Sequence, residues 1–290
     1  MLRKTLKWTL LSIGGLLILL ILFYVVIYFK TESRINKQYN VTVQTLAIPT
    51  DSLSYVRGKH VAENRGCLGC HGNNLANGRA IMDAQSPLGV LYAPNITSGK
   101  GGINYQDADW IRLLRHGLNQ QNKSVWFMPS HEIYHISNQE LAAMISYLKQ
   151  QPPVDQTVPA RSLKPLGRVL TFLNKFPLLP AEMIDHKAVY VETVQVAVSP
   201  GYGAYLATIC QGCHGANMKG GPAHNKSEPA IPDISATGNT SHWNEAGFIT
   251  AFRTGKTPEG KQLSDAMPWK IFTYTDDELK AILLHLKQVK

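Results

Sequence analysis

The chain contains the stretch Cys67-Leu68-Gly69-Cys70-His71 and, 143 residues later, the stretch Cys210-Gln211-Gly212-Cys213-His214. Together they hold all four cysteines of the 290 residues. A C-x-x-C-H pattern is typical of covalent haem attachment, because two thiols three positions apart can add to the two vinyl groups of one porphyrin while the adjacent histidine is directed at the iron. We therefore predict two covalently bound haem c groups, one held by Cys67 and Cys70 and the other by Cys210 and Cys213.

Two other uses of paired cysteines are open alternatives. In a zinc ribbon the second pair follows the first by about 15–20 residues, whereas Cys70 and Cys210 are 140 residues apart. A thioredoxin-like dithiol accompanies a strand–helix–strand pattern, which the sequence does not display. The spacing thus favours haem over zinc or a redox dithiol.

An apolar run of 22 residues without a charge extends over residues 8–29. At about 1.5 Å per residue, a helix of this length crosses a hydrocarbon core of about 30 Å. The run exceeds the roughly 7–15 apolar residues of a signal peptide, and no small-x-small cleavage site closes it. We expect a retained single-pass anchor in a lipid bilayer, with a cleaved signal peptide as the alternative.

The charges exclude one class of partner and leave the orientation to the haem. Residues 1–50 hold six Lys or Arg and one Glu, which accounts for +5 of the net charge of +9. The remainder is nearly balanced, so no basic face for nucleic acid is expected. Basic residues flank the apolar run on both sides and hardly set its direction. Because haem c is attached on the exported side in bacteria, we expect the N-terminus in the cytoplasm, the anchor in the inner membrane and both motifs in the periplasm.

The second half of the chain repeats the first at an offset near 138 residues. The repeat predicts two lobes, at residues 52–151 and 200–290. The matched pieces are Pro94-Asn95-Ile96-Thr97 with Pro232-Asp233-Ile234-Ser235, Arg115-His116-Gly117 with Arg253-Thr254-Gly255, and Met128-Pro129 with Met267-Pro268.

Each repeat ends in a helix whose start is marked by a capping-box pattern, Ser137 with Glu140 and Thr275 with Glu278. An apolar stripe at helical spacing follows each cap. Further helices are expected from about Asp107 and Asn244, and short ones lead into the haem motifs. Since no convincing alternating strand is present, we predict an all-α fold of two tandem lobes behind one N-terminal transmembrane helix.

Between the lobes, residues 152–199 form a proline-rich segment that we call the strap. Proline stiffens its path, and its many apolar side chains are unsuited to water. We expect the strap to pack against one or both lobes and hold the haems at a fixed separation. The alternative is an exposed surface for a membrane or a partner protein.

Several pieces now support a resemblance. The two C-x-x-C-H-Gly motifs, the prolines before Asn95-Ile96 and Asp233-Ile234, and the two Met-Pro pairs resemble a membrane-anchored dihaem cytochrome c with two class I domains in tandem. Ala93–Thr97 and Trp110–Gly117 are similar to cytochrome subunits of membrane-bound quinoprotein alcohol dehydrogenases. Those subunits carry three haems, whereas this sequence has two motifs.

The resemblance implies a complete set of ligands for each haem. His71 and His214 would be proximal iron ligands, and Met128 and Met267 would be distal ones. The spacing permits this, since 61 residues separate Cys67 from Met128 and 57 separate Cys210 from Met267. The resemblance further implies that the backbone carbonyls of Pro94 and Pro232 accept a hydrogen bond from the proximal imidazoles.

Other distal ligands remain possible. Methionine is an ordinary core residue, and Met144 lies on the apolar stripe of a capped helix. His131 and His135 follow Met128 closely, but the second lobe has no equivalent histidine near Met267. A bis-His or open site in one lobe is therefore the alternative to His/Met coordination of both irons.

The function predicted is a one-electron relay, without a catalytic site of its own. The donor would be a quinol-oxidising complex or a dehydrogenase in the membrane, and the acceptor an oxidase or a soluble cytochrome. The alternative is a dihaem cytochrome c peroxidase with one open-site haem, against which the Met-Pro pair in both lobes and the close repeat argue. A haem sensor ranks last, because no output domain is evident.

Overall fold

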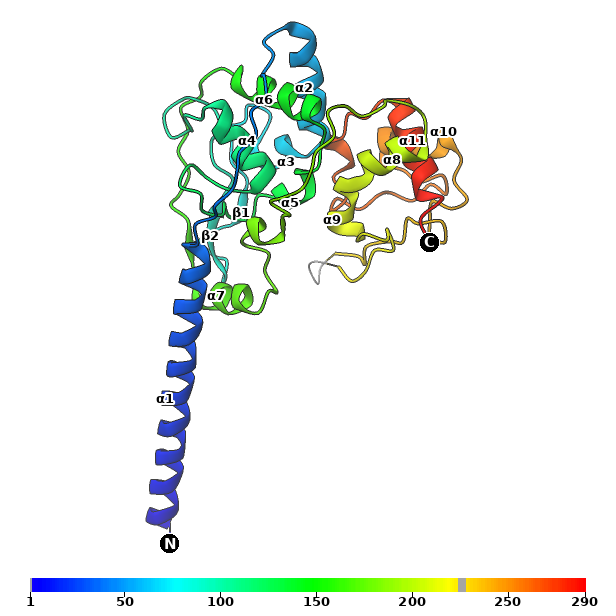
Figure 1. Ribbon diagram of the computed structural model, residues 1–290. Helices are drawn as coiled ribbons and strands as arrows, with labels where there is room; N and C mark the ends of the chain where they lie inside the picture. The colour runs from blue at the N-terminus through cyan, green and yellow to red at the C-terminus, as the bar shows by residue number, and fades with distance from the viewer. Residues whose placement is uncertain (1, 224–227) are drawn as a thin grey trace.

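The computed structural model describes residues 2–223 and 228–290, and these form two helical lobes and one long projecting helix (Figure 1). The helices and strands follow in the order α1 (Leu2–Ile35), α2 (Ser52–Asn64), α3 (Cys67–His71), β1 (Ala80–Met82), β2 (Gly89–Tyr92), α4 (Asp107–His116), α5 (Ser130–Ile133), α6 (Asn138–Lys149), β3 (Ser162–Leu163), α7 (Pro165–Phe172), η1 (Pro180–Met183), α8 (Pro200–Ala207), η2 (Thr208–Cys210), α9 (Gln211–His214), α10 (Glu245–Thr254), η3 (Trp269–Ile271) and α11 (Asp276–Leu286).

Helix α1 contains the predicted anchor and extends it at both ends. Its apolar side chains are exposed along nearly its whole length, and it is long and apolar enough to cross a membrane. In Figure 1 it projects away from the first lobe. The helix therefore has no packing partner within the described protein for most of its apolar surface.

Each lobe is built on a close crossing of its first and last long helices. In the first lobe α2 packs on α6, and in the second α8 packs on α11. Glycine is required at both crossings, because a β-carbon on Gly58 would lie 1.9 Å from the carbonyl oxygen of Ala143, and one on Gly203 would lie 1.8 Å from that of Ala281. Each lobe encloses its own apolar core around this crossing.

The predicted helix starts are correct, but one predicted capping box is opened. Thr275 and Glu278 form the reciprocal box at the start of α11. At α6 the Ser137 side chain does accept from the Glu140 backbone N–H. In a complete box the Glu140 carboxylate would accept from the Ser137 N–H. Here the hydroxyl of Tyr205, from the second lobe, lies between them: it accepts from the Ser137 N–H at 2.9 Å and donates to the Glu140 carboxylate. Hydrogen bonds to Tyr205 of the other lobe have thus replaced the local hydrogen bond between Ser137 and Glu140.

The fold is mostly helical, as predicted, with a small addition of β-structure. β1 and β2 pair antiparallel, and β2 pairs antiparallel with β3 of the strap. These strands have two to four residues and an irregular register, so they carry too little alternation to be read from the sequence. In the second lobe the equivalent pairing is a single bridge between Gly221 and Ile231.

The strap packs against the first lobe, as expected. Leu178, Leu179 and Ala181 are buried. The backbone carbonyls of Val191 and Glu192 accept hydrogen bonds from the first residues of α6. Part of the strap, including α7, nevertheless exposes apolar side chains.

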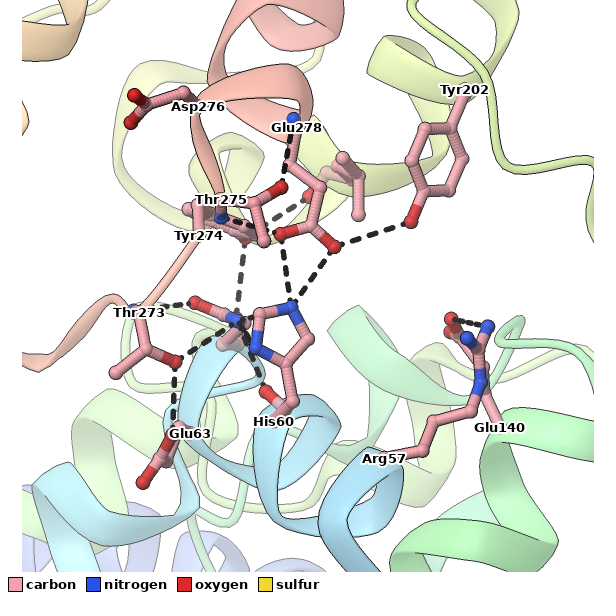
Figure 2. Close-up of polar contacts among 12 residues, drawn as sticks. Arg57, His60, Glu63, Glu140, Tyr202, Thr273, Tyr274, Thr275, Asp276 and Glu278 are labelled. Atoms are coloured by element: carbon pink, nitrogen blue, oxygen red, sulfur yellow. Dashed lines mark hydrogen bonds and ion pairs between the residues drawn. The ribbon is translucent and has the colours of Figure 1, made fainter. Parts of the chain in front are cut away.

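Polar side chains join the two lobes, and Figure 2 shows the central group. Nε2 of His60, on α2, lies 2.9 Å from both carboxylate oxygens of Glu278, on α11. The hydrogen bond to Glu278 outweighs burial and raises the pKa of His60. Nearby, the Thr273 N–H donates to Oδ1 of Asn64 at 2.9 Å. These contacts fix α2 against the start of α11.

A buried cation adds a second connection between the lobes. The guanidinium of Arg65, which is 4% exposed, donates to Oγ1 of Thr208 at 2.9 Å and lies over the Tyr205 ring. Tyr205 itself packs against both lobe cores. The interface therefore includes buried contacts as well as the polar ones.

The helix crossings give the first prediction. In Gly203→Ala the new methyl group meets a backbone carbonyl that cannot turn aside, so we expect a loss of about 1–3 kcal/mol or more of unfolding free energy. The measurement is denaturant unfolding of the holoprotein followed by circular dichroism. Gly201→Ala is the control, because nothing lies within 4 Å of that position; equal stability of the two variants would contradict the account.

Candidate haem sites

Both cysteine pairs lie on a short helical turn that ends in a left-handed glycine. α3 carries the first motif and is followed by Gly72 at φ 76°, and α9 carries the end of the second and is followed by Gly215 at φ 73°. A side chain disfavours such a φ, so glycine lets the chain turn directly after each histidine. All four cysteine thiols are unpaired with one another.

Each motif histidine contacts a proline carbonyl of its own lobe. Nδ1 of His71 lies 2.8 Å from the oxygen of Pro94, and Nδ1 of His214 lies 2.9 Å from that of Pro232. Since the carbonyl can only accept, Nδ1 carries the proton and Nε2 remains available to a metal. Burial lowers the pKa of both imidazoles, which favours the neutral form that binds metals.

The short strands place these prolines. Pro94 follows β2 by two residues, and β2 is held by its pairing with β1. Pro232 directly follows the bridge between Gly221 and Ile231. The β-structure that the sequence did not reveal is thus the element that brings each carbonyl to its histidine.

The environment of the cysteines does not fit the alternatives to haem. Burial raises the pKa of Cys67 and of Cys210 to about 12, whereas the reactive cysteine of a redox dithiol has a lowered pKa. In the described part of the chain, no three His, Cys, Asp or Glu side chains are grouped so as to hold a metal ion.

The other methionines are accounted for by their positions. Met82, Met144 and Met218 are buried in the core. Met218 matches Leu75 of the first lobe: both have a positive φ, and each carbonyl accepts from the isoleucine N–H two residues after the matched proline. Met183 is 45% exposed on the strap.

Met128 and Met267 lie at matched positions in similar turns. The Met128 carbonyl accepts from the Ser130 N–H at 2.7 Å, and the Met267 carbonyl accepts from the Trp269 N–H at 2.8 Å. Both side chains are half-buried. The first turn is also braced by the strap, because the Phe127 N–H donates to the Leu178 carbonyl at 2.8 Å.

Sequence reasoning missed two arginines that bind the loops following Met128-Pro129 and Met267-Pro268. Buried Arg115 donates to the carbonyls of Tyr134 and Ile136, and Arg253 donates to that of Tyr274 at 2.7 Å. Each arginine thereby holds the end of a Met-Pro loop at the start of α6 or α11. The signal was present in the repeat, which aligns Arg115 with Arg253 at the same offset as the helices.

The two candidate histidines line the lobe interface. His131 and His135 face a cavity of about 430 Å³ with Glu132 and, from the second lobe, Thr208, Gln211 and Gly212. Burial lowers the pKa of His135 to about 4 and raises that of Glu132 to about 7. Because Gln211 and Gly212 belong to the second haem motif, the cavity borders that motif.

The residues present fit a haem in each lobe. A covalently bound haem needs two neighbouring thiols and an imidazole with a free Nε2, and both lobes supply these groups. Each lobe also has a half-buried methionine that is a candidate for the sixth ligand. The first lobe adds a half-buried indole: within residues 2–223 and 228–290, the buried Nε1 of Trp126 has no hydrogen-bond partner. An anionic haem propionate beside Trp126 would satisfy it.

The two haem motifs contact each other's lobes in a reciprocal way. A β-carbon on Gly69, in the first motif, would lie 3.2 Å from Cδ1 of Ile271. One on Gly212, in the second motif, would lie 2.6 Å from Oε1 of Glu132. Ile271 and Glu132 each follow a Met-Pro methionine by four residues. Each attachment turn therefore faces the other lobe.

The comparison with protein families agrees with this geometry. The model of the family described as "Cytochrome c" matches residues 55–152 and 198–290, which cover most of both lobes. The chain belongs to the cytochrome c family, whose domains bind haem c covalently.

Similar proteins include subunits of dehydrogenases. The chain is 22% identical over 277 aligned positions to the "Alcohol dehydrogenase (quinone), cytochrome c subunit" of Gluconacetobacter polyoxogenes and to that of Komagataeibacter europaeus, covering 82% of this chain and 56% of each relative. It is 27% identical over 220 positions to a nicotinate dehydrogenase subunit of Pseudomonas putida, covering 69% of this chain and 18% of that relative. The chain thus spans about half the length of the two alcohol dehydrogenase subunits.

The methionine positions give the second prediction. If Met128 and Met267 are the distal ligands that the resemblance implies, Met128→Ala or Met267→Ala should convert one haem of the two to a lower-potential form that binds carbon monoxide, because the sixth iron position would lose its thioether. Visible absorption and a redox titration of the reduced protein measure this. Met183→Ala is the matched control and should leave the spectrum unchanged. If His135→Ala, and not Met128→Ala, opens the first haem, the assignment to Met128 is wrong.

Proposed function

We propose that the chain is a membrane-anchored dihaem c-type cytochrome that relays single electrons on the periplasmic side of the inner membrane. Cys67 and Cys70 would hold one haem and Cys210 and Cys213 the other. His71 and Met128 would be the axial ligands of the first iron, and His214 and Met267 those of the second. Bound there, each haem supplies an iron that alternates between ferrous and ferric states.

The reciprocal contact of the attachment turns is the observation that carries this proposal. A relay between two redox groups requires them to be close and held rigidly, since the transfer rate falls steeply with distance. Gly69 and Gly212 both lie against the opposite lobe. The ion pair of His60 with Glu278 and the buried Arg65 hold that arrangement.

Methionine coordination of both irons would leave no position open to a substrate. The cysteines would form thioethers with the haem vinyl groups, and each lobe has a methionine, Met128 or Met267, available as a sixth ligand. The carbonyls of Pro94 and Pro232 fix the imidazole rings and raise their basicity. We infer that the chain acts as an electron-transfer component and not as an enzyme by itself.

The partners proposed are redox proteins of the same membrane. The dehydrogenase subunits to which the chain is similar support a dehydrogenase or quinol-oxidising complex as the donor. An oxidase or a soluble cytochrome would accept the electrons. Helix α1 would restrict the search for both to the membrane surface.

Carbon monoxide distinguishes this function from that of a dihaem peroxidase. The fully reduced holoprotein should contain two haems per chain and form no carbon monoxide complex, because His/Met coordination would leave no open position on either iron. The measurement is visible absorption with haem quantified per chain. A complex at one of the two haems would mean an open distal position and would favour the peroxidase.

The second haem motif faces the carboxylate of Glu132, whereas the first faces the apolar side chain of Ile271. This difference predicts that Glu132 affects the midpoint potential of only the second haem. A carboxylate beside the second motif stabilises the ferric state there, so Glu132→Gln should raise the midpoint potential of one haem by tens of millivolts. Because burial raises the pKa of Glu132 to about 7, the effect should be present above that pH and vanish well below it, where the carboxyl is neutral.

Redox titrations of the two haems across this pH range measure the effect. Glu245→Gln removes the same charge from an exposed position of the second lobe and serves as the control. An equal shift in both variants, or a shift at acidic pH, would show that Glu132 has no special influence on the second haem.

A further inference from the structure

Helix α7, in the strap, carries apolar side chains that the rest of the described protein leaves uncovered. Leu166 is 46% exposed, and Leu173, which directly follows the helix, is 53% exposed. Leu170 lies between them at helical spacing on the same side. Gly167 and Thr171, on a neighbouring side, are buried. A continuous apolar stripe of this kind is typical of a surface that meets another apolar phase.

A set of polar contacts fixes α7 against α1. The guanidinium of Arg168 lies 2.7 Å from Oε1 of Glu32 and 4.2 Å from the ring centroid of Tyr28. The guanidinium of Arg34 donates to the Thr171 carbonyl at 2.7 Å. The two helices therefore form one packed unit at the base of the first lobe (Figure 1).

These contacts lie where the apolar run of α1 ends. Phe29 is the last residue of that run, and the partners of α7 on α1 lie between Tyr28 and Arg34. Ile27 is 3% exposed although it belongs to the run, whereas Val26 is 52% exposed and Phe29 is 66% exposed. One helical turn rises about 5.4 Å, so α7 lies within about a turn of the level at which a spanning α1 leaves the hydrocarbon.

We propose that α7 is a second membrane contact, which rests in the interface with Leu166, Leu170 and Leu173 directed into the lipid. The occupant is the bilayer because α7 is continuous with the helix that would span it. Exposed Lys30 directly follows the apolar run of α1, and exposed Lys175 follows Leu173 by two residues; basic residues near the membrane surface favour anionic headgroups. The inference rests on the membrane anchor of the proposed function.

The second contact has a mechanical consequence for the lobes. A single spanning helix leaves the domain that follows it free to tilt and rotate above the membrane. A contact at α7 limits this motion, because α7 is joined to the first lobe through the pairing of β3 with β2. The haem motifs would then be held at a defined height and orientation for a partner in the same membrane.

Lipid cross-linking tests the proposal directly. The holoprotein is placed in nanodiscs of phosphatidylethanolamine and phosphatidylglycerol that contain a lipid with a diazirine on its acyl chain, and it is illuminated and digested with trypsin. Mass spectrometry then compares the peptides covering residues 162–168 and 169–175 with two internal references. Residues 8–30 report on the anchor, and residues 38–57 include Leu53 and Val56, which are well exposed on α2 at the far end of the lobe (Figure 1).

The expected result is cross-linking of residues 162–175 at least an order of magnitude above that of residues 38–57. Leu166→Gln with Leu173→Gln should abolish it while residues 8–30 stay cross-linked, and Leu53→Gln with Val56→Gln should change nothing. Cross-links on residues 8–30 with none above background on α7 would overturn this inference and leave the anchor standing. If residues 8–30 are not cross-linked, the anchor fails and this inference fails with it.

Discussion

The hydrogen bond between each motif histidine and a proline carbonyl is the constraint on which both sites depend. It joins two segments that are 23 residues apart in the first lobe and 18 in the second, and it leaves Nε2 of His71 and of His214 free. To make this bond, the chain must turn sharply after the histidine, which the left-handed glycines allow. It must also return beside the motif before the proline, which the short strands and the bridge achieve. The helix crossings at Gly58 and Gly203 then close each lobe around this arrangement.

The two lobes are joined by contacts that use the same elements. Tyr205, close to the second haem motif, takes over half of the capping box at Ser137, so the start of α6 is completed by the other lobe. Glu278 closes its own box at α11 and also binds His60. Because the caps that start the last helices also form the interface, the separation of the haem motifs is built into the folding of each lobe.

Much of this architecture could be predicted from the sequence, because its signals are local. The C-x-x-C-H motifs, the caps at Ser137 and Thr275 and the apolar stripes each depend on residues within a few positions of one another. The strands could not be predicted, since two to four residues carry no reliable alternation. The partners of Arg115 and Tyr205 are set by tertiary contacts, and no local pattern specifies them. The strap combines the packing that was expected with the exposed surface that was the alternative: Leu178 and Leu179 are buried, while Leu166 and Leu173 remain exposed.

The central claim is that each lobe holds one covalently attached haem. Mass spectrometry of the chain produced in cells that mature c-type cytochromes tests it most directly, first on the intact protein and then on its peptides. The account predicts a polypeptide heavier by two haems, with one on the peptide containing Cys67 and Cys70 and one on the peptide containing Cys210 and Cys213. A chain with unmodified thiols in either motif, or with zinc bound in place of haem, would contradict it.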